Sequence, residues 1–259
     1  MLDSLKGKVC VVTGSARSIG FGIAEKYAKD GAKVAMIDIN SEVENSAKKL
    51  TDQGGIAKAY ILDITDRDAV LKCFEQIEKD LGPVFSLVNT AGIVDQRPFE
   101  DITADMINKQ MAVNVNGALF CSQGAVKSMK ANKEGRIINF SSKSGKTGSA
   151  LMAHYSAAKG ALIAMTHALA FELANDNIQV NCICPGITDA SGVWAEVSKG
   201  YTENLKLPRE EVIKKFTAKI PLQRLTNIED VVEMVFFLTL KGDYMTGQAY
   251  NITGGREMH

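Results

Sequence analysis

Short apolar segments and amphipathic segments alternate along almost the whole chain. The apolar segments span four to eight residues and are rich in β-branched side chains, which is typical of strands buried in a parallel sheet. We expect strands over residues 9–12, 33–38, 57–64, 85–89, 135–141, 178–184 and 249–252. Apolar residues three and four positions apart predict helices over residues 23–31, 41–53, 70–81, 103–130, 155–173 and 228–240. The alternation predicts an α/β fold, a doubly wound parallel sheet of about seven strands with helices on both faces.

The alternation lapses only between residues 188 and 220. No Pro/Gly/Ser-rich linker divides the chain, so we predict one domain over residues 1–259. An insertion at the edge where parallel sheets bind ligands is expected to act as a substrate lid. Trp194, the only tryptophan, lies in this segment and is expected either to pack on a substrate or to anchor the lid.

A glycine turn over residues 13–20 joins the first strand to the first helix. Gly14 and Gly20 allow the backbone and the positive end of the helix to approach a pyrophosphate, as in Rossmann-type dinucleotide sites. Asp38 ends the second strand, where such folds place a carboxylate that binds the adenosine ribose. Its charge would repel the 2′-phosphate of NADP, whereas Arg17 would attract one. We favour NAD because Asp38 would meet the ribose hydroxyl directly.

Candidate catalytic chemistry lies between residues 142 and 159. Tyr155 and Lys159 are four positions apart and share one face of a helix. A nearby ammonium lowers the pKa of a phenol, so we expect Tyr155 to exchange protons near neutral pH. Ser142 follows the fifth strand and is expected to hold a substrate oxygen beside that phenol. Asn114 and Asn116 lie in the long helix over 103–130, where polar side chains either bend the helix or face solvent.

Composition excludes several other classes of protein. Lysine plus arginine equals aspartate plus glutamate at 30 each, so no basic excess indicates nucleic-acid binding, and a small neutral or mildly polar substrate is expected. The chain begins without a signal peptide's apolar core and contains no apolar run long enough to span a membrane, so we expect a cytoplasmic protein. The five cysteines are scattered, and Cys182 and Cys184 lack the spacing of metal ligands, so no metal is expected.

From residue 8 to residue 255 the chain resembles the short-chain dehydrogenase/reductase family. The resemblance rests on motifs in order and at the expected spacing: Thr13-Gly14 with Ile19-Gly20, Asn89-Thr90-Ala91-Gly92, Asn114, Ser142, Tyr155-x-x-x-Lys159 and Pro185-Gly186. It implies an NAD cofactor, a homotetramer and catalytic roles for Asn114, Ser142, Tyr155 and Lys159. It also implies a set of cofactor-binding residues: Gly14, Arg17, Ser18, Ile19, Gly20, Asp38, Asp63, Ile64, Asn89, Ala91, Gly92, Tyr155, Lys159, Pro185, Gly186, Ile187 and Thr188.

Three positions depart from the family pattern. Ser18 replaces the middle glycine of the turn, Thr90 replaces an asparagine, and Ala190 stands where a threonine often contacts the nicotinamide carboxamide. We expect weaker cofactor contacts but unchanged chemistry.

Within the family the chain resembles polyol dehydrogenases. The motif after Ser142 is similar to enzymes that act on phosphorylated sorbitol, whereas Asp189 followed by Trp194 is similar to enzymes that act on the free polyol. Lys143 and Lys146 would either bind a phosphate or be solvated loop lysines. The expected substrate-binding residues are Ser142, Lys143, Ser144, Asp189 and Trp194. The alternatives are another secondary alcohol, such as an acyclic diol or a hydroxysteroid, and a cofactor-binding regulator without turnover.

Overall fold

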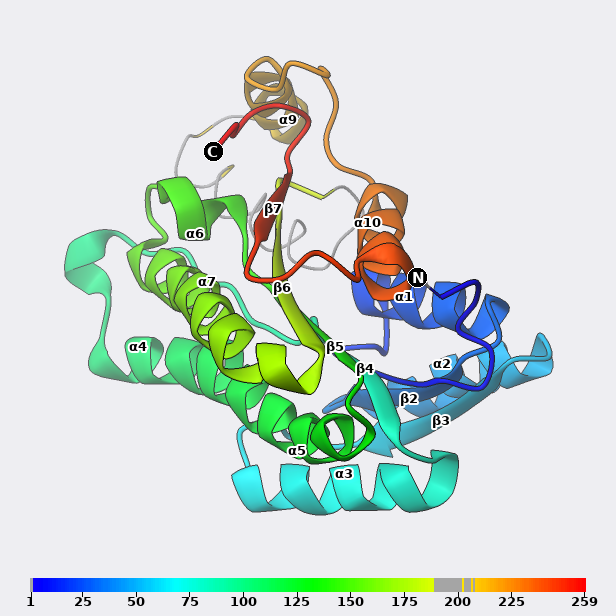
Figure 1. Ribbon diagram of the computed structural model, residues 1–259. Helices are drawn as coiled ribbons and strands as arrows, with labels where there is room; N and C mark the ends of the chain where they lie inside the picture. Colours follow the sequence, from blue (N-terminus) through cyan, green and yellow to red (C-terminus); the bar gives the residue numbers. More distant parts are fainter. Residues whose placement is uncertain (1, 189–201, 203–205, 207) are drawn as a thin grey trace.

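A seven-stranded sheet forms the centre of the molecule, with helices on both faces (Figure 1). The computed structural model describes residues 2–188, 202, 206 and 208–259. All neighbouring strands pair in parallel, in the order β3-β2-β1-β4-β5-β6-β7. The strands are β1 (Val9–Thr13), β2 (Lys33–Asp38), β3 (Ile56–Ile61), β4 (Val84–Asn89), β5 (Gly135–Phe140), β6 (Ile178–Pro185) and β7 (Ala249–Ile252). The predicted fold class is therefore confirmed.

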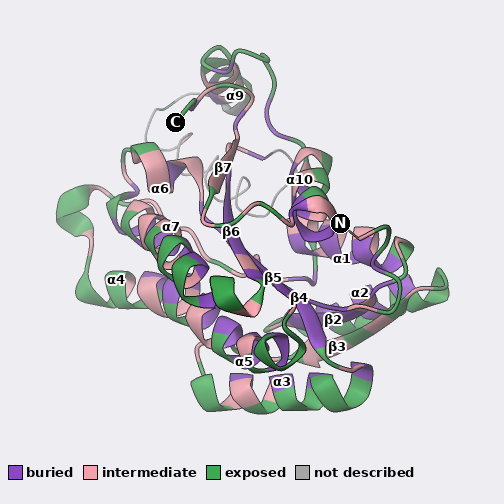
Figure 2. Cartoon of the chain, in the orientation of Figure 1, coloured by how far each residue is buried: buried purple, intermediate pink, exposed green. Residues whose placement is uncertain are grey.

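Two layers of helices cover the sheet because side chains in a strand alternate between its faces. In β1, Cys10 and Val12 face one hydrophobic cluster, whereas Val9 and Val11 face the other. The first layer contains α1 (Ser18–Lys29), α2 (Glu42–Asp52) and α10 (Ile228–Lys241). The second contains α3 (Arg67–Leu81), α5 (Gly117–Asn132) and α7 (Ala153–Leu173). Figure 2 shows the central strands almost wholly buried and the helices buried on their inner faces, whereas the edge strands β3 and β7 are partly exposed.

The remaining helices surround the carboxyl ends of the strands or extend the layers. They are η1 (Phe99–Asp101), α4 (Ala104–Met111), η2 (Ala112–Asn116), α6 (Lys143–Thr147), η3 (Ala174–Asp176) and α9 (Arg209–Thr217). The predicted helix over 103–130 is thus interrupted by η2, a π-helical turn. The loop expected after Ser142 contains the short helix α6, for which Ser142 is the N-cap, its hydroxyl accepting from the Ser144 N–H at 3.1 Å.

Strand order reverses between β1 and β4, since the chain first builds outward through β2 and β3 and then returns to the other side of β1. In doubly wound sheets this reversal opens a crevice outside the carboxyl ends of the strands, where ligands bind. The loops that follow β1, β4, β5 and β6 all begin at this edge.

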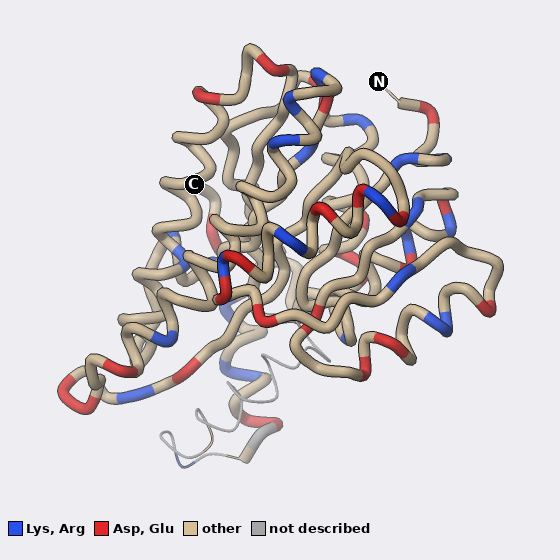
Figure 3. The backbone as a smooth tube through the Cα atoms, turned by 90° about the horizontal axis from the view of Figure 1, so that it is seen from below, with Lys and Arg blue, Asp and Glu red and all other residues tan. Residues whose placement is uncertain are grey.

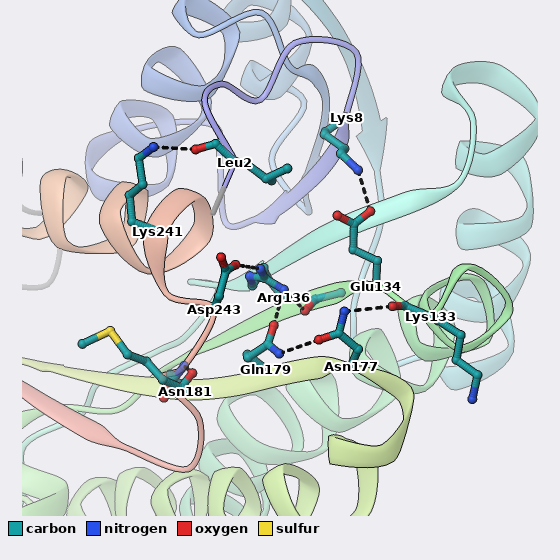
Figure 4. A network of polar contacts seen from close by, with 12 residues as sticks. Leu2, Lys8, Lys133, Glu134, Arg136, Asn177, Gln179, Asn181, Lys241 and Asp243 are labelled. Carbon is teal, nitrogen blue, oxygen red and sulfur yellow. Dashed lines mark hydrogen bonds and ion pairs between the residues drawn. The ribbon is translucent and has the colours of Figure 1, made fainter.

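A polar network ties together the amino ends of the strands, at the edge opposite the crevice. The Arg136 guanidinium, on β5, donates to Gln179 of β6 and pairs with Asp243 beyond α10 (Figure 4). Gln179 in turn donates to Asn177 at 3.2 Å, and Asn177 donates to the Lys133 carbonyl at 3.1 Å. These bonds link the amino ends of β5 and β6 to the segments that follow α5 and α10.

Charged residues of both signs are mixed along the outer helices (Figure 3). No extended region of one sign is visible in that view, which agrees with the balanced composition. None of the helices in the described part of the chain combines the length and the apolarity needed to cross a lipid bilayer.

Candidate active site

A cavity of about 540 Å³ opens along the carboxyl edge of β1, β4, β5 and β6. It brings together most of the residues that the sequence predicts for catalysis and for binding. These are Gly14, Arg17, Ser18, Ile19, Gly20, Asp38, Gly92, Asn114, Ser142, Lys143, Ser144, Tyr155, Lys159, Pro185, Gly186, Ile187 and Thr188. Residues as far apart in the chain as Gly14 and Thr188 therefore line one cavity.

Four predicted cofactor residues do not line this cavity. Asn89 is buried in the sheet and donates to the Asn139 side chain at 3.0 Å, and Ala91 donates its N–H to the Thr13 hydroxyl at 3.2 Å. Ile64 packs against Gly117 of α5, and the exposed Asp63 accepts hydrogen bonds from Thr65. Asn89 and Ala91 therefore help to hold the strand ends beside the cavity, whereas Asp63 and Ile64 have local contacts outside its lining. Asp189, Ala190 and Trp194 lie outside the described residues.

Sequence reasoning missed other lining residues: Ala16, Ile39, Asn40, Thr90, Ile93, Val94, Phe140, Ser141, Ser149 and Met152. Several of these are neighbours of predicted residues, and the strand-end position alone was a signal for Ile39, Asn40 and Ser141. Val94 and Met152 carried no such signal, because only the packing of distant segments brings them here.

The turn after β1 is shaped to accept a pyrophosphate. Gly14 has a left-handed φ of +65°, and a Cβ on Gly20 would lie 2.2 Å from the Gly14 carbonyl oxygen, so neither position tolerates a side chain. Arg17, the N-cap residue of α1, makes no capping hydrogen bond with its side chain, which leaves backbone N–H groups of the first turn available to an anion. Ser18, which stands in the place of a glycine, adopts the left-handed φ of +57° that glycine usually supplies. The turn therefore keeps its course despite the substitution.

Thr90 joins the cofactor turn to the loop after β4. Its hydroxyl donates to the Thr13 carbonyl, and the Thr13 hydroxyl accepts from Ala91, so two hydrogen bonds link the ends of β1 and β4. We expected the threonine in place of asparagine to weaken cofactor contacts. In the structure Thr90 lines the cavity, and its bond to the Thr13 carbonyl holds the turn in place.

Asp38 is held rigidly at the end of β2. One carboxylate oxygen accepts from the Ala16 N–H at 3.0 Å and the other from the Asn40 N–H at 2.9 Å. Asp38 and Arg17 both line the cavity, and the carboxylate is bound by the N–H of Ala16, the residue before Arg17.

Tyr155 and Lys159 lie on the first two turns of α7, both buried in the single chain. The Lys159 ammonium lies 5.8 Å from the centre of the Tyr155 ring and donates to the Phe140 carbonyl at 2.8 Å. Burial raises the pKa of Tyr155 to about 12, although a hydrogen bond with Ser142 acts in the opposite direction. Burial also lowers the pKa of Lys159 to about 8. The expectation of a depressed tyrosine pKa does not hold for the protein alone, because desolvation outweighs the pull of a lysine aimed at a carbonyl.

Asn114 is placed by the π-helical turn η2 within the predicted long helix. Its side chain is buried, accepting from the Ile93 N–H at 3.1 Å and donating to the Ile93 carbonyl at 3.0 Å. Asn116, two residues on, is exposed. Turns of this kind are frequent at functional sites, because the extra residue redirects a side chain. The structure thus separates two asparagines that the sequence left equivalent.

The described part of the predicted lid packs over α7, the helix that carries Tyr155 and Lys159. Val212, on α9, is fully buried in a cluster with Met152 and Tyr155, together with Ile220 and Leu225. The segment therefore covers the site through side-chain contacts with the same turn that carries the tyrosine. Among the described residues, no group of three histidine, cysteine or acidic side chains is placed to hold a metal ion.

The arrangement of turn, acid and Ser-Tyr-Lys cluster is paralleled in known proteins. The family model for the short chain dehydrogenases matches residues 8–202. The chain belongs to the short-chain dehydrogenase family. Its resemblance to the polyol dehydrogenases of this family is confirmed by a 36% identity to a sorbitol dehydrogenase from Cereibacter sphaeroides, over 98% of this chain and 99% of that protein.

Solved structures of the family have the same fold. A xylitol dehydrogenase with bound NAD⁺ superposes with a TM-score of 0.91 at 30% identity, covering 97% of this chain and 99% of that one. A protein from Beutenbergia cavernae, assigned as an NAD(P)-dependent gluconate 5-dehydrogenase and holding NADP at low occupancy, gives 0.88 at 31% identity and covers 98% of each chain. Members of the family bind a nicotinamide cofactor, and the glycine turn, the open N-terminus of α1 and Asp38 fit that group.

Proposed function

We propose that this chain is an NAD-dependent dehydrogenase that interconverts a secondary alcohol of a polyol and the corresponding ketone. The observation that carries the proposal is the convergence of Ser142, Tyr155, Lys159 and Asn114 in one cavity with the cofactor turn. A non-catalytic regulator is disfavoured because it would have no need to retain all four side chains at this spacing.

In this proposal the Tyr155 phenol is the group that exchanges a proton with the substrate oxygen. Ser142 holds that oxygen through its hydroxyl, which is close enough to Tyr155 to lower the pKa of the phenol. The bound nicotinamide supplies the hydride acceptor and a positive charge. Lys159, held by the Phe140 carbonyl, lies close enough to the ring to favour the phenolate further once the site is closed to water. Asn114 is proposed to hold a water that relays the proton onward.

The preference for NAD is proposed from Asp38. Its two backbone hydrogen bonds leave it no freedom to turn away, so a 2′-phosphate on the adenosine ribose would meet a fixed carboxylate. Because Arg17 lines the same region, the test is direct: kcat/KM with NAD should exceed that with NADP by about tenfold or more, the effect of roughly 1.4 kcal/mol. A preference for NADP would refute the role of Asp38.

A polyol is proposed because the cavity continues from Ser142 into further polar groups. The hydroxyls of Ser144 and Ser149 lie 2.8 Å apart, and both residues line the cavity. Each hydroxyl keeps further hydrogen-bonding capacity for the additional hydroxyls of a sugar alcohol, which the apolar body of a hydroxysteroid would leave unused.

A homotetramer is proposed because α7 presents an apolar stripe to solvent in the single chain. Ala157, Ala164 and Ala168 are exposed on the helix, and Phe171 at its end is 87% exposed. Small residues permit close packing between helices, so this stripe suits a second copy of the chain.

Replacement of Tyr155 by phenylalanine tests the chemistry. Removing the hydroxyl should abolish hydride transfer to NAD from a polyol, measured as NADH absorbance, because no other group at the site exchanges the proton. Affinity for NADH, measured by fluorescence titration, should change by less than about threefold, since the ring remains. Turnover retained by Tyr155→Phe would exclude the proposed acid–base role.

A further inference from the structure

The two lysines that follow Ser142 have different environments. Lys146 donates to the Ala249 carbonyl on β7 at 2.7 Å and does not line the cavity. Lys143 lines it, with its side chain only 14% exposed. Lys143 also lines a second cavity of about 500 Å³, formed between α6 and the C-terminal tail. Lys143 thus joins the active site to a neighbouring space.

Charged side chains of the tail form the far wall of that space. The Glu257 carboxylate lies 4.0 Å from the Lys143 ammonium and 3.4 Å from the Arg256 guanidinium, and its side chain is 6% exposed. Arg256 stacks on the Phe216 ring of α9, 5.6 Å from its centre, which ties the tail to the predicted lid. Thr253 exchanges hydrogen bonds with the backbone of Glu257, so the cluster is held in place.

This cluster contains more positive than negative charge. Burial lowers the pKa of Lys143, and the nearby charges of Arg256 and Lys219 lower it further, whereas Glu257 acts in the opposite direction. Lys143 and Arg256 therefore flank one carboxylate in a poorly solvated space, and the exposed Lys219 adds a third positive charge nearby. An additional anion there would relieve the repulsion.

Two polar atoms of the cluster are buried without a hydrogen-bond partner among the described residues, Arg256 Nη1 and Glu257 Oε2. The arginine nitrogen needs an acceptor and the carboxylate oxygen needs a donor. An anionic group with a hydroxyl next to it offers both at once. A neutral polyol offers hydroxyls but leaves the excess of positive charge uncompensated.

We propose that Lys143, Arg256 and Glu257 form a subsite for an anionic end of the substrate, a carboxylate or a phosphate on a polyol chain whose reacting carbon lies at Ser142 and Tyr155. This inference rests on the proposed polyol dehydrogenase activity and specifies its substrate class. The two cations bind the anion, and Glu257 accepts from the hydroxyl next to it. The substrate is then bound at two points, with its reacting carbon at Ser142 and its anionic end at the neighbouring Lys143.

The test compares three six-carbon substrates: sorbitol, gluconate and sorbitol 6-phosphate. The wild-type protein should oxidise at least one anionic substrate with a kcat/KM about tenfold or more above that for sorbitol, the effect expected of a charge-assisted hydrogen bond. Preference for gluconate assigns the subsite to a carboxylate, and preference for sorbitol 6-phosphate assigns it to a phosphate.

Arg256→Gln should reduce the ratio of anionic to neutral kcat/KM by about tenfold or more. Lys143→Gln should act in the same direction and provides the test if the arginine variant fails to fold, as judged by circular dichroism. Lys146→Gln is the matched control, a lysine of the same helix that lies outside the cavity, and should leave the ratio within about twofold.

Equal use of all three substrates, or a ratio that survives both variants, would overturn the subsite while leaving the proposed dehydrogenase intact. Absence of NADH formation with these and with other secondary alcohols would overturn the proposed function itself, and the subsite with it. The two failures are therefore distinguishable in one set of assays.

Discussion

Gly92 lies where the loop after β4 meets the proposed catalytic groups Asn114 and Lys159, and its replacement by alanine provides a sensitive test of the site geometry. An added Cβ would lie 2.5 Å from Asn114 Oδ1 and 3.3 Å from the Lys159 ammonium. The first distance is 0.9 Å below the 3.4 Å at which ordinary van der Waals contact begins. Since the Gly92 backbone has no left-handed φ, the expected effect is steric rather than conformational.

The overlap must displace the Asn114 side chain, because the loop is fixed by its bonds to β1. Overpacking costs about 1–3 kcal/mol, and loss of the bonds between Asn114 and Ile93 adds about 1 kcal/mol. A total of about 2–4 kcal/mol corresponds to a fall in Tm of roughly 5–15 °C for a protein of this size. We expect kcat to fall by about 10–100-fold as well, because a shift of about 1 Å in a positioning group has effects of that order.

Gly160→Ala is the matched control on the catalytic helix. Its added Cβ would lie 3.4 Å from the Gly145 carbonyl oxygen, at ordinary contact distance, and alanine favours a helix by up to about 1 kcal/mol. Differential scanning fluorimetry and NADH formation should show Gly160→Ala close to wild type and Gly92→Ala impaired in both. A Gly92→Ala protein with unchanged Tm and kcat would refute the inference that Asn114 is clamped against this loop.

Two further predictions concern charge and backbone strain. The pKa of Lys159 is lowered from an ordinary value of 10.5 to about 8 in the folded protein. Between pH 8 and pH 10.5 the unfolded chain therefore holds a proton on Lys159 that the native protein has lost. Native stability conferred through Lys159 therefore rises with pH, by up to about 1.4 kcal/mol per unit. The difference in Tm between the cofactor-free wild-type protein and Lys159→Met should shift in favour of the wild type from about pH 8 to about pH 10, and a difference that is flat with pH would contradict the burial of a titrating ammonium. Ser18 has a φ of +57°, so Ser18→Gly should retain stability and NADH affinity. Ser18→Val should lose about 1–3 kcal/mol of stability, because β-branched residues tolerate this region poorly. Denaturant unfolding of the two variants measures the difference, and an equally stable valine variant would argue against the left-handed turn.

The sequence was sufficient for the features that depend on local spacing. A Tyr and a Lys four residues apart on a helix share a face, and strands that alternate with helices favour parallel pairing. The parallel sheet was therefore predicted correctly, and Tyr155 and Lys159 lie on one helix and line one cavity as expected. Asp38 was found in the same way, because a strand end in this fold has a known place relative to the glycine turn. The substitution at Ser18 left the turn intact, since serine can adopt the conformation that glycine normally supplies.

Only the tertiary structure decided which of two neighbouring residues lines the cavity and which is buried or bonded elsewhere. Lys143 and Lys146 belong to one short helix, yet one lines the cavity and the other binds a carbonyl of β7, a strand more than a hundred residues away. The direction of the Tyr155 pKa shift likewise depends on how deeply α9 and its neighbours bury the phenol, and spacing along a helix carries no information about burial. Spacing along the chain determines which groups share an element, whereas solvation and long-range packing determine how those groups behave.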